Sequence, residues 1–264
     1  MSEDILRRDR DERGVVTLTL DQPEIRNAFD DEFMAAIRRA FDDLANDDGL
    51  RVVVLTGAGT AFSAGANINW MRSMKNNTLE ENREDSRQLD DLFRTINHFP
   101  RPVVARVNGA SFGGATGLIA CADIAVASRN AVFAFSETKL GIAPAVISTY
   151  VQPKIGISNA RRYFLTGERF DADRALQIGL VHEVCDHDDL DETTERVVSE
   201  LLTAGPNAQR AVKQLVREVA AADSEEAAAE HTVPLIARLR VSDEGQEGMA
   251  AFFDKRRPEW APSD

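Results

Sequence analysis

Residues that bind metals or form disulfides are scarce in this chain of 264 residues. Its two cysteines, Cys121 and Cys185, and its four scattered histidines offer neither a disulfide framework nor the spacing of a metal site. No apolar run approaches the roughly 18 residues that a membrane helix needs. The acidic first four residues lack the basic and apolar regions of a signal peptide. These absences predict a cytoplasmic protein with no metal and no membrane partner.

Positive charge is also in short supply. The chain has 31 Lys and Arg against 44 Asp and Glu, which gives a formal net charge of −13. Nucleic acids are bound by clustered Lys and Arg, so we expect no nucleic-acid partner. An anionic small ligand is still compatible with this charge, because a few basic side chains near its phosphates can reverse the local sign. Five of the basic residues are lysines: Lys75, Lys139, Lys154, Lys213 and Lys255.

The first part of the chain alternates predicted strands and helices. Short apolar runs predict strands at 15–20, 51–55, 103–107 and 124–127. An apolar face predicts a helix capped by Asp30 or Asp31, and a second helix is expected at 86–98. The last part of the chain is helical from about Ser158 onward, with patterns at 171–178, 190–202, 207–221 and 225–239. This organisation predicts an α/β core over residues 1–200 and a helical region for oligomerisation over residues 201–264.

Two segments dense in small residues, 57–69 and 107–118, each follow a predicted strand. Small residues let a ligand approach the main chain and leave N–H groups free to point at it. The start of a helix also favours a developing negative charge. Neither segment has the spacing of a dinucleotide fingerprint or of a P-loop. A tight turn with close helix–strand packing explains one such segment, but two of them at strand ends favour a paired N–H site.

Five segments, in this order along the chain, resemble those of the enoyl-CoA hydratase/isomerase (crotonase) superfamily. They are Pro23–Ala28, Ala61–Met71, Asn108–Gly117, Phe135–Gly141 and Gly248–Pro258. The resemblance implies an α/β fold with a ββα spiral core over residues 1–200 and helices for trimerisation and coenzyme A contact over residues 201–264. It also implies an acyl-CoA thioester substrate, no cofactor besides that substrate's own coenzyme A, and a homotrimer or a dimer of trimers.

The resemblance implies roles for single residues. The N–H groups of Ala66 and Gly114 would hold the thioester oxygen. Lys255 would approach the coenzyme A phosphates, in this family often those bound by a neighbouring subunit; without the resemblance it is simply a solvated lysine near the end of the chain. The other residues implied along the path of the substrate are Arg26, Ala28, Ala64, Asn67, Ile68 and Gly117.

Many hydratases of the family carry two catalytic glutamates, and this chain keeps one of them. Gly117 stands where the first belongs, and Glu137 stands where the second belongs. Glu137 follows an apolar stretch, Ala131–Phe135, so apolar surroundings would raise its pKa and suit it to general acid/base work. The simpler alternative is an exposed loop acid paired with Lys139.

One carboxylate allows two reactions on a thioester enolate. It can activate water and return a proton to C2, which is hydration, or carry a proton between C2 and C4, which is Δ3,Δ2 isomerisation. Segments 69–71, 112–118 and 142–148 resemble bacterial methylglutaconyl-CoA or carboxygeranoyl-CoA hydratases, which implies hydration of a branched 2-enoyl-CoA, with Gly117 making room for the branch. A third hypothesis is a homologue that binds acyl-CoA or RNA without catalysis, and the net charge disfavours RNA.

Overall fold

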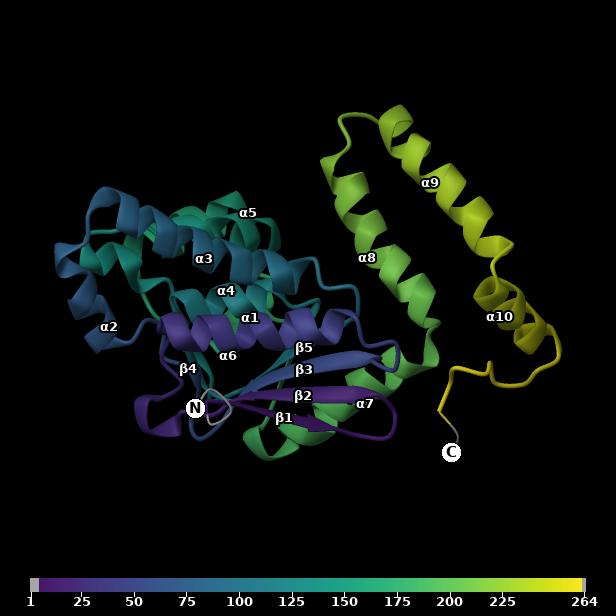
Figure 1. Ribbon diagram of the computed structural model, residues 1–264, viewed down its shortest axis with the longest axis horizontal. Helices are drawn as coiled ribbons and strands as arrows, with labels where there is room; N and C mark the ends of the chain where they lie inside the picture. The colour runs from purple at the N-terminus through teal and green to yellow at the C-terminus, as the bar shows by residue number, and fades with distance from the viewer. Residues whose placement is uncertain (1–4, 263–264) are drawn as a thin grey trace.

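The computed structural model describes residues 5–262, which form two β-sheets with helices packed around them (Figure 1). The larger sheet has six strands. In order across the sheet they are β1 (Leu6–Arg10), β2 (Val15–Leu20), β3 (Val52–Gly57), β5 (Val103–Val107), β7 (Ile124–Ser128) and β10 (Glu183–Cys185). Neighbouring strands run parallel, except that β1 and β2 are antiparallel. The four predicted strands are confirmed as β2, β3, β5 and β7.

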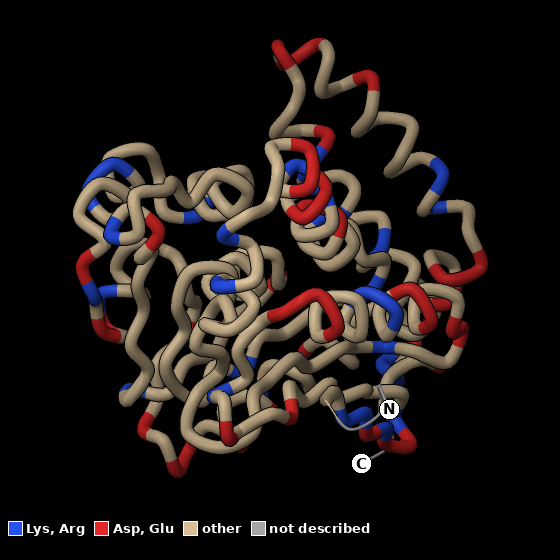
Figure 2. Tube along the Cα trace, turned by 60° about the vertical axis from the view of Figure 1, so that its left-hand side comes forward, with Lys and Arg blue, Asp and Glu red and all other residues tan. Residues whose placement is uncertain are grey.

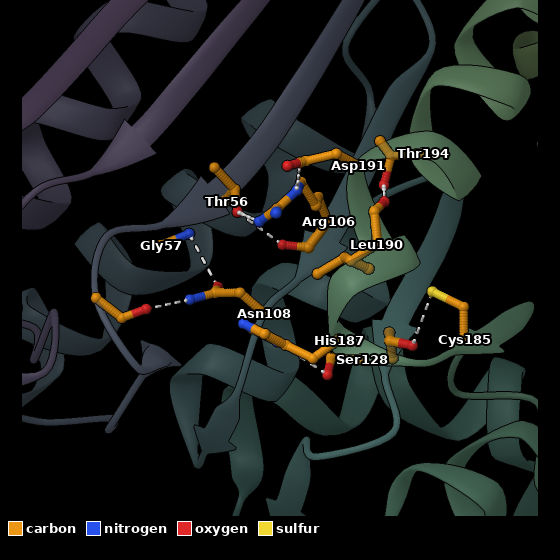
Figure 3. Close-up of polar contacts among 12 residues, drawn as sticks. Thr56, Gly57, Arg106, Asn108, Ser128, Cys185, His187, Leu190, Asp191 and Thr194 are labelled. Carbon is orange, nitrogen blue, oxygen red and sulfur yellow. Dashed lines mark hydrogen bonds and ion pairs between the residues drawn. The ribbon is translucent and has the colours of Figure 1, made fainter.

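Both faces of this sheet are apolar because side chains alternate along each strand. On β2, Val16 and Leu18 belong to the main core, whereas Val15 belongs to a smaller cluster on the opposite face. The helices over the main core are α1 (Asp31–Ala45), α3 (Leu79–Asn97), α4 (Gly114–Cys121) and α5 (Ala145–Thr166). Helix α7 (Leu190–Thr203) covers the other face. There, Arg106 of β5 donates to Asp191 of α7 over 2.7 Å (Figure 3).

The smaller sheet has four strands: β4 (Ala61–Ser63), β6 (Ala110–Phe112), β8 (Val132–Ala134) and β9 (Phe170–Asp171). Strands β4, β6 and β8 follow β3, β5 and β7 after short turns, so the chain passes three times from the larger sheet to the smaller one. A helical segment comes after each passage, and these segments begin with α2 (Ile68–Ser73), α4 and the 3₁₀ helix η3 (Ser136–Leu140). This confirms the predicted spiral of ββα units.

The predicted helices form, although two begin earlier than expected. The side chain of Asp30 accepts from the N–H of Phe33 and caps α1, as predicted. Helix α3 begins at Leu79 rather than at Ser86. Helix α5 begins at Ala145, well before residue 158, and bends at Gly156 beyond Pro153. The remaining short elements are η1 (Pro23–Ile25), η2 (Met74–Asn76), α6 (Ala172–Gln177) and η4 (His187–Asp189).

Three helices at the end of the chain, α8 (Pro206–Ala221), α9 (Glu225–Arg240) and α10 (Asp243–Phe253), form what we call the C-terminal arm. Figure 1 shows α8 and α9 as a hairpin that stands away from the sheets. On α8, Lys213 bonds to Asp123 of the core over 2.6 Å, which fixes the lower part of the arm. The arm exposes large apolar side chains, among them Val212, Val216, Val219, Val233, Ile236, Phe252 and Phe253. The division at residues 200 and 201 stays a prediction.

Basic and acidic residues are interspersed over the molecule (Figure 2). Many arginines form ion pairs with carboxylates, as Arg13 does with Asp11 and Glu195. Among residues 5–262, no helix combines the length and the apolar character needed to cross a membrane.

Candidate active site

A cavity of about 520 Å³ brings together three residues that the sequence singled out: Ala66, Gly114 and Glu137. It lies between α2, η2 and α3 on one side and the segment that leads into α5 on the other. Most of its wall is apolar, formed by Phe29, Met34, Trp70, Met74, Leu89, Ile142, Ala143, Pro144, Ala145, Val146 and Ile147.

The main chain around Ala66 is held by its neighbours and leaves one donor free. The N–H of Phe29 donates to Gly65 over 2.7 Å, and the N–H of Asn67 donates to Phe29 over 2.7 Å. These bonds place residues 28–29 beside residues 65–67 in a parallel bridge. Within residues 5–262 the N–H of Ala66 donates to no acceptor, and Ala66 is exposed to the cavity. That N–H is therefore available to a ligand.

Asn27 anchors the turn that precedes Ala66. It is fully buried, with a φ of 54°, a left-handed conformation that Asn tolerates better than most residues. Its amide nitrogen donates to Ala58, Ala61 and Phe62 over 3.0, 3.0 and 3.1 Å. Its own carbonyl accepts from the Ser63 hydroxyl over 2.6 Å. A buried side chain with this many hydrogen bonds fixes the loop, because leaving buried polar groups without partners is costly.

Gly114 supplies the second N–H at the start of α4. Gly113 is the N-cap, with φ 53° and ψ −122°, and its N–H donates to Ala134 of the smaller sheet over 3.0 Å. The N–H of Gly114 is one of the first donors of the helix and has no acceptor within residues 5–262. The helix dipole adds positive potential at this point. A side chain at Gly114 would collide with the ring of Phe29, which explains the need for glycine.

Asn108 ties the two N–H segments to each other. Its side-chain oxygen accepts from the N–H of Gly57 over 3.3 Å, and its amide nitrogen donates to Gly59 over 3.0 Å (Figure 3). The loop after β3 is thereby bonded to the loop after β5. The spacing between the two free N–H groups thus depends on side chains outside the cavity.

Glu137 is largely buried, and one of its carboxylate oxygens lacks a partner. It lies on η3, after the buried Phe135. Oε2 is shielded from solvent and accepts no hydrogen bond within residues 5–262. Burial raises the pKa of Glu137 above its ordinary value. This confirms the apolar surroundings that the sequence predicted, and Lys139 forms no ion pair with Glu137 among the described residues. An unpaired carboxylate in an apolar cavity can take and return a proton.

Gly117 does not line the cavity, in contrast to the expectation that it contacts the substrate. It is buried inside α4, and a β-carbon there would stand 2.7 Å from Ile147 and 2.7 Å from Phe93. These two side chains fill the space in which an acyl branch was expected, and which a glutamate at this position would need. The reason is packing between helices: α3 and α5 approach α4 where it has no side chain.

The other predicted contact residues lie apart from the cavity wall. Arg26 is exposed, and its carbonyl accepts from the N–H of Ala64 over 2.9 Å, so the two lie side by side near Ala66. Ala28 is buried, with 7% of its surface exposed, while Ile68 is 67% exposed. Asn67 caps α2 by accepting from the N–H of Asn69.

Lys255 lies just after α10 at the far end of the C-terminal arm, and Figure 1 shows α10 on the opposite side of the molecule from α2 and α3. The structure therefore does not bring Lys255 to the cavity of its own chain.

Two cavity residues, Asn82 and Asp85, were missed because the start of α3 was missed, and Ser86, where the predicted helix begins, was not recognised as part of the cavity. Asn82, Asp85 and Ser86 share one face of α3, at positions i, i+3 and i+4, and line the cavity opposite the apolar wall. The sequence did carry the signal. Thr78 and Glu81 form a reciprocal capping box, the pattern Ser/Thr-x-x-Glu that marks the first turn of a helix.

Residues 10–263 match the family described as enoyl-CoA hydratase/isomerase. Two relatives come from Escherichia coli. The 2,3-dehydroadipyl-CoA hydratase is 31% identical over 98% of this chain and 99% of its own. The 1,2-epoxyphenylacetyl-CoA isomerase is 30% identical over 94% of this chain and 95% of its own.

Solved structures resemble the chain along its whole length. An enoyl-CoA hydratase from Shewanella pealeana superposes with a TM-score of 0.93 at 40% identity, covering 97% of this chain and 96% of the other. AtuE of Pseudomonas aeruginosa gives a TM-score of 0.94 at 35% identity, covering 98% and 100%.

Proposed function

Because the chain belongs to the enoyl-CoA hydratase/isomerase family, we propose that it is an enoyl-CoA hydratase whose active site is the cavity around Ala66, Gly114 and Glu137. One observation carries the proposal. Two unoccupied N–H groups and a carboxylate with an unpaired oxygen open into the same, mostly apolar cavity. Such a cavity suits a reaction in which negative charge develops on an oxygen while a proton is moved nearby.

The two N–H groups bind the thioester oxygen of the substrate. When a nucleophile adds at C3, the electrons of the double bond move toward that oxygen and an enolate forms. Donors that are already in place stabilise this charge without reorganising, and each is typically worth about 10²–10³ in rate. The free N–H of Ala66 and that of Gly114, at the start of α4, have the chemistry for this role.

Glu137 handles the proton. Its carboxylate accepts a proton from water as the water oxygen bonds to C3, and the enolate is held by the N–H pair. The same carboxyl group then gives a proton to C2, and the thioester carbonyl forms again. The reaction so written needs no cofactor beyond the coenzyme A of the substrate. The raised pKa of Glu137 helps the second half of the cycle, because a weaker acid retains its proton until the enolate takes it.

Isomerisation is the second candidate, and the packing around Gly117 favours it. Phe93 and Ile147 fill the place of a second carboxylate, so Glu137 acts alone. A single carboxylate can remove a proton from C2 of a 3-enoyl-CoA, which forms a dienolate, and deliver the proton to C4, which leaves the double bond between C2 and C3. The branched acyl chain implied by the detailed resemblance remains a proposal, because the space expected for the branch at Gly117 is occupied.

Replacing Glu137 tests both candidates. Glu137→Gln keeps the shape of the side chain and should lower kcat by about 10²–10⁴. Loss of the conjugated enoyl absorbance of crotonyl-CoA reports hydration, and its gain from 3-hexenoyl-CoA reports isomerisation. Glu12→Gln, at an exposed residue outside the cavity, is the matched control. Full turnover by Glu137→Gln would contradict both mechanisms.

We also propose a homotrimer or a dimer of trimers, in which the C-terminal arm packs on a neighbouring subunit and brings Lys255 to that subunit's coenzyme A. Two features support this. The arm exposes a series of apolar side chains, and α10, which Lys255 follows, lies on the opposite side of the molecule from α2 and α3 (Figure 1). Exposed apolar patches of this kind mark interfaces.

A further inference from the structure

The charge of the cavity wall points to a substrate class, and this step rests on the function proposed above. Apart from Glu137, the polar side chains of the wall come from α3 and are those of Asn82, Asp85 and Ser86. Among the described residues that line the cavity, the charged ones are Asp85 and Glu137, and none is Lys, Arg or His. A ligand that reaches this wall therefore meets negative charge.

The hydrogen-bond donors of this wall are already engaged. The amide nitrogen of Asn82 donates to the carbonyls of Asn77 and Thr78 over 3.4 and 3.0 Å. The hydroxyl of Ser86 donates to the carbonyl of Asn82 over 2.8 Å. On the α3 side of the cavity, the groups still able to form hydrogen bonds with a ligand are the acceptor oxygens of Asn82, Asp85 and Ser86. A second carboxylate would find no donor there.

The surroundings of Asp85 do not neutralise it. The charges that act on it come from Asp31, Glu81 and Glu84, and all are negative. Its neutral partner is the amide nitrogen of Asn77, which donates to Oδ2 over 3.3 Å. Burial, followed by the charge of Asp31, raises the pKa of Asp85.

The nearby arginines of α3 are directed elsewhere. Arg83 and Arg87 form ion pairs with Glu80 and Glu84, and they line a different surface hollow from Asp85. No cation of this helix is thus placed to receive an anionic acyl chain in the cavity.

We propose that Asp85 determines specificity: the cavity accepts acyl chains with no charge at their far end and rejects those that end in a carboxylate. Like charges a few Å apart in a partly desolvated site repel strongly enough to change binding by tenfold or more. The family relative named 2,3-dehydroadipyl-CoA hydratase offers the matching test molecule. Its acyl chain has the six carbons of 2-hexenoyl-CoA, with a carboxylate in place of the terminal methyl group.

The experiment compares kcat/KM for 2-hexenoyl-CoA and 2,3-dehydroadipyl-CoA. The natural sequence should prefer the neutral substrate by roughly a hundredfold, and Asp85→Asn should reduce that preference about tenfold. The control is Asp91→Asn, which removes the same charge from the same helix outside the cavity and should leave the preference unchanged. Unfolding curves of both variants establish that they are folded.

The outcomes separate this proposal from the proposed function. Equal or faster turnover of 2,3-dehydroadipyl-CoA by the natural sequence would overturn the charge selection while leaving the hydratase intact. If the folded Asp85→Asn variant keeps the full preference for 2-hexenoyl-CoA, Asp85 is not the residue that rejects the carboxylate. If neither substrate is hydrated and 3-hexenoyl-CoA is not isomerised, it is the proposed function that fails.

Discussion

The carboxylate of Glu137 lies against the main chain of Gly113, so closely that a β-carbon on Gly113 would stand 3.3 Å from Oε1. Gly113 precedes Gly114, whose N–H is free at the start of α4. The carboxylate of Glu137 therefore lies against the residue next to the one that supplies the second N–H group. Their relative position depends on a glycine with positive φ and no side chain.

Gly113→Ala should damage both stability and activity. A backbone with φ 53° and ψ −122° costs a residue with a β-carbon about 1–3 kcal/mol of folding free energy. The new methyl group would also stand 3.3 Å from Oε1 of Glu137 and push that side chain aside. We expect kcat/KM to fall at least about tenfold. The control is Gly156→Ala, where φ is 73° but nothing lies within 4 Å of the added carbon. That variant should lose similar stability in urea unfolding and keep its kcat/KM; an equal loss of activity would contradict the argument.

Glu137→Gln should lower activity but raise stability, and the raised pKa of Glu137 is the reason. Between the ordinary value of 4.5 and the raised value, the folded state binds more protons than the unfolded state. The free energy of unfolding therefore falls as pH rises through this window. Glu137→Gln lacks the ionisation, so at pH 7.5 it should have a larger free energy of unfolding than the natural sequence.

Urea unfolding at pH 4 and pH 7.5 measures this effect. The advantage of Glu137→Gln should shrink at pH 4, while Glu12→Gln, at an exposed position, should show no such trend. The acid limb of kcat/KM should also lie above pH 4.5, because the base must be ionised to activate water. A stability difference that is the same at both pH values would show that burial of the charge is not the cause.

The packing at Gly117 predicts that this position tolerates no side chain. A β-carbon would stand 2.7 Å from both Phe93 and Ile147, so Gly117→Ala should cost about 1–3 kcal/mol of unfolding free energy. Ile147→Ala is itself destabilising, but it opens space for the new methyl group. The double variant should therefore be less destabilised than the sum of the single ones, by about 1 kcal/mol. Strict additivity in urea unfolding would show that Gly117 is not limited by Ile147.

Gly117 and α3 show which features of the fold and the site could be predicted from the sequence and which could not. The main-sheet strands and most helices were predictable because alternation and apolar faces are local patterns. The first turns of α3 were predictable from Thr78 and Glu81 but were missed, and with them Asp85. What fills the space at Gly117 was not predictable, because Phe93 and Ile147 come from two other helices. Nor does any local pattern say where the arm carries Lys255.

Lys255 should serve the active site of a neighbouring chain. It lies just after α10, on the opposite side of the molecule from α2 and α3 (Figure 1). Lys255→Ala should lower kcat/KM for acyl-CoA about tenfold through lost phosphate contact. Glu137→Gln removes the proton-transfer group instead. Mixed oligomers of the two variants then contain some sites with Glu137 from one chain and Lys255 from the next. In a randomly mixed trimer such sites are about a quarter of the total.

Refolding the two variants together from urea measures this directly. Activity of the mixture should rise above the mean of the separately refolded variants, toward about a quarter of the natural value. Refolding Lys255→Ala alone, at the same total protein concentration, is the control for refolding yield. If Lys255 instead reached its own cavity, no mixed oligomer could contain a complete site, and the activity of the mixture would equal the mean. That result would exclude the exchange of arms that the exposed apolar side chains of α8–α10 suggest.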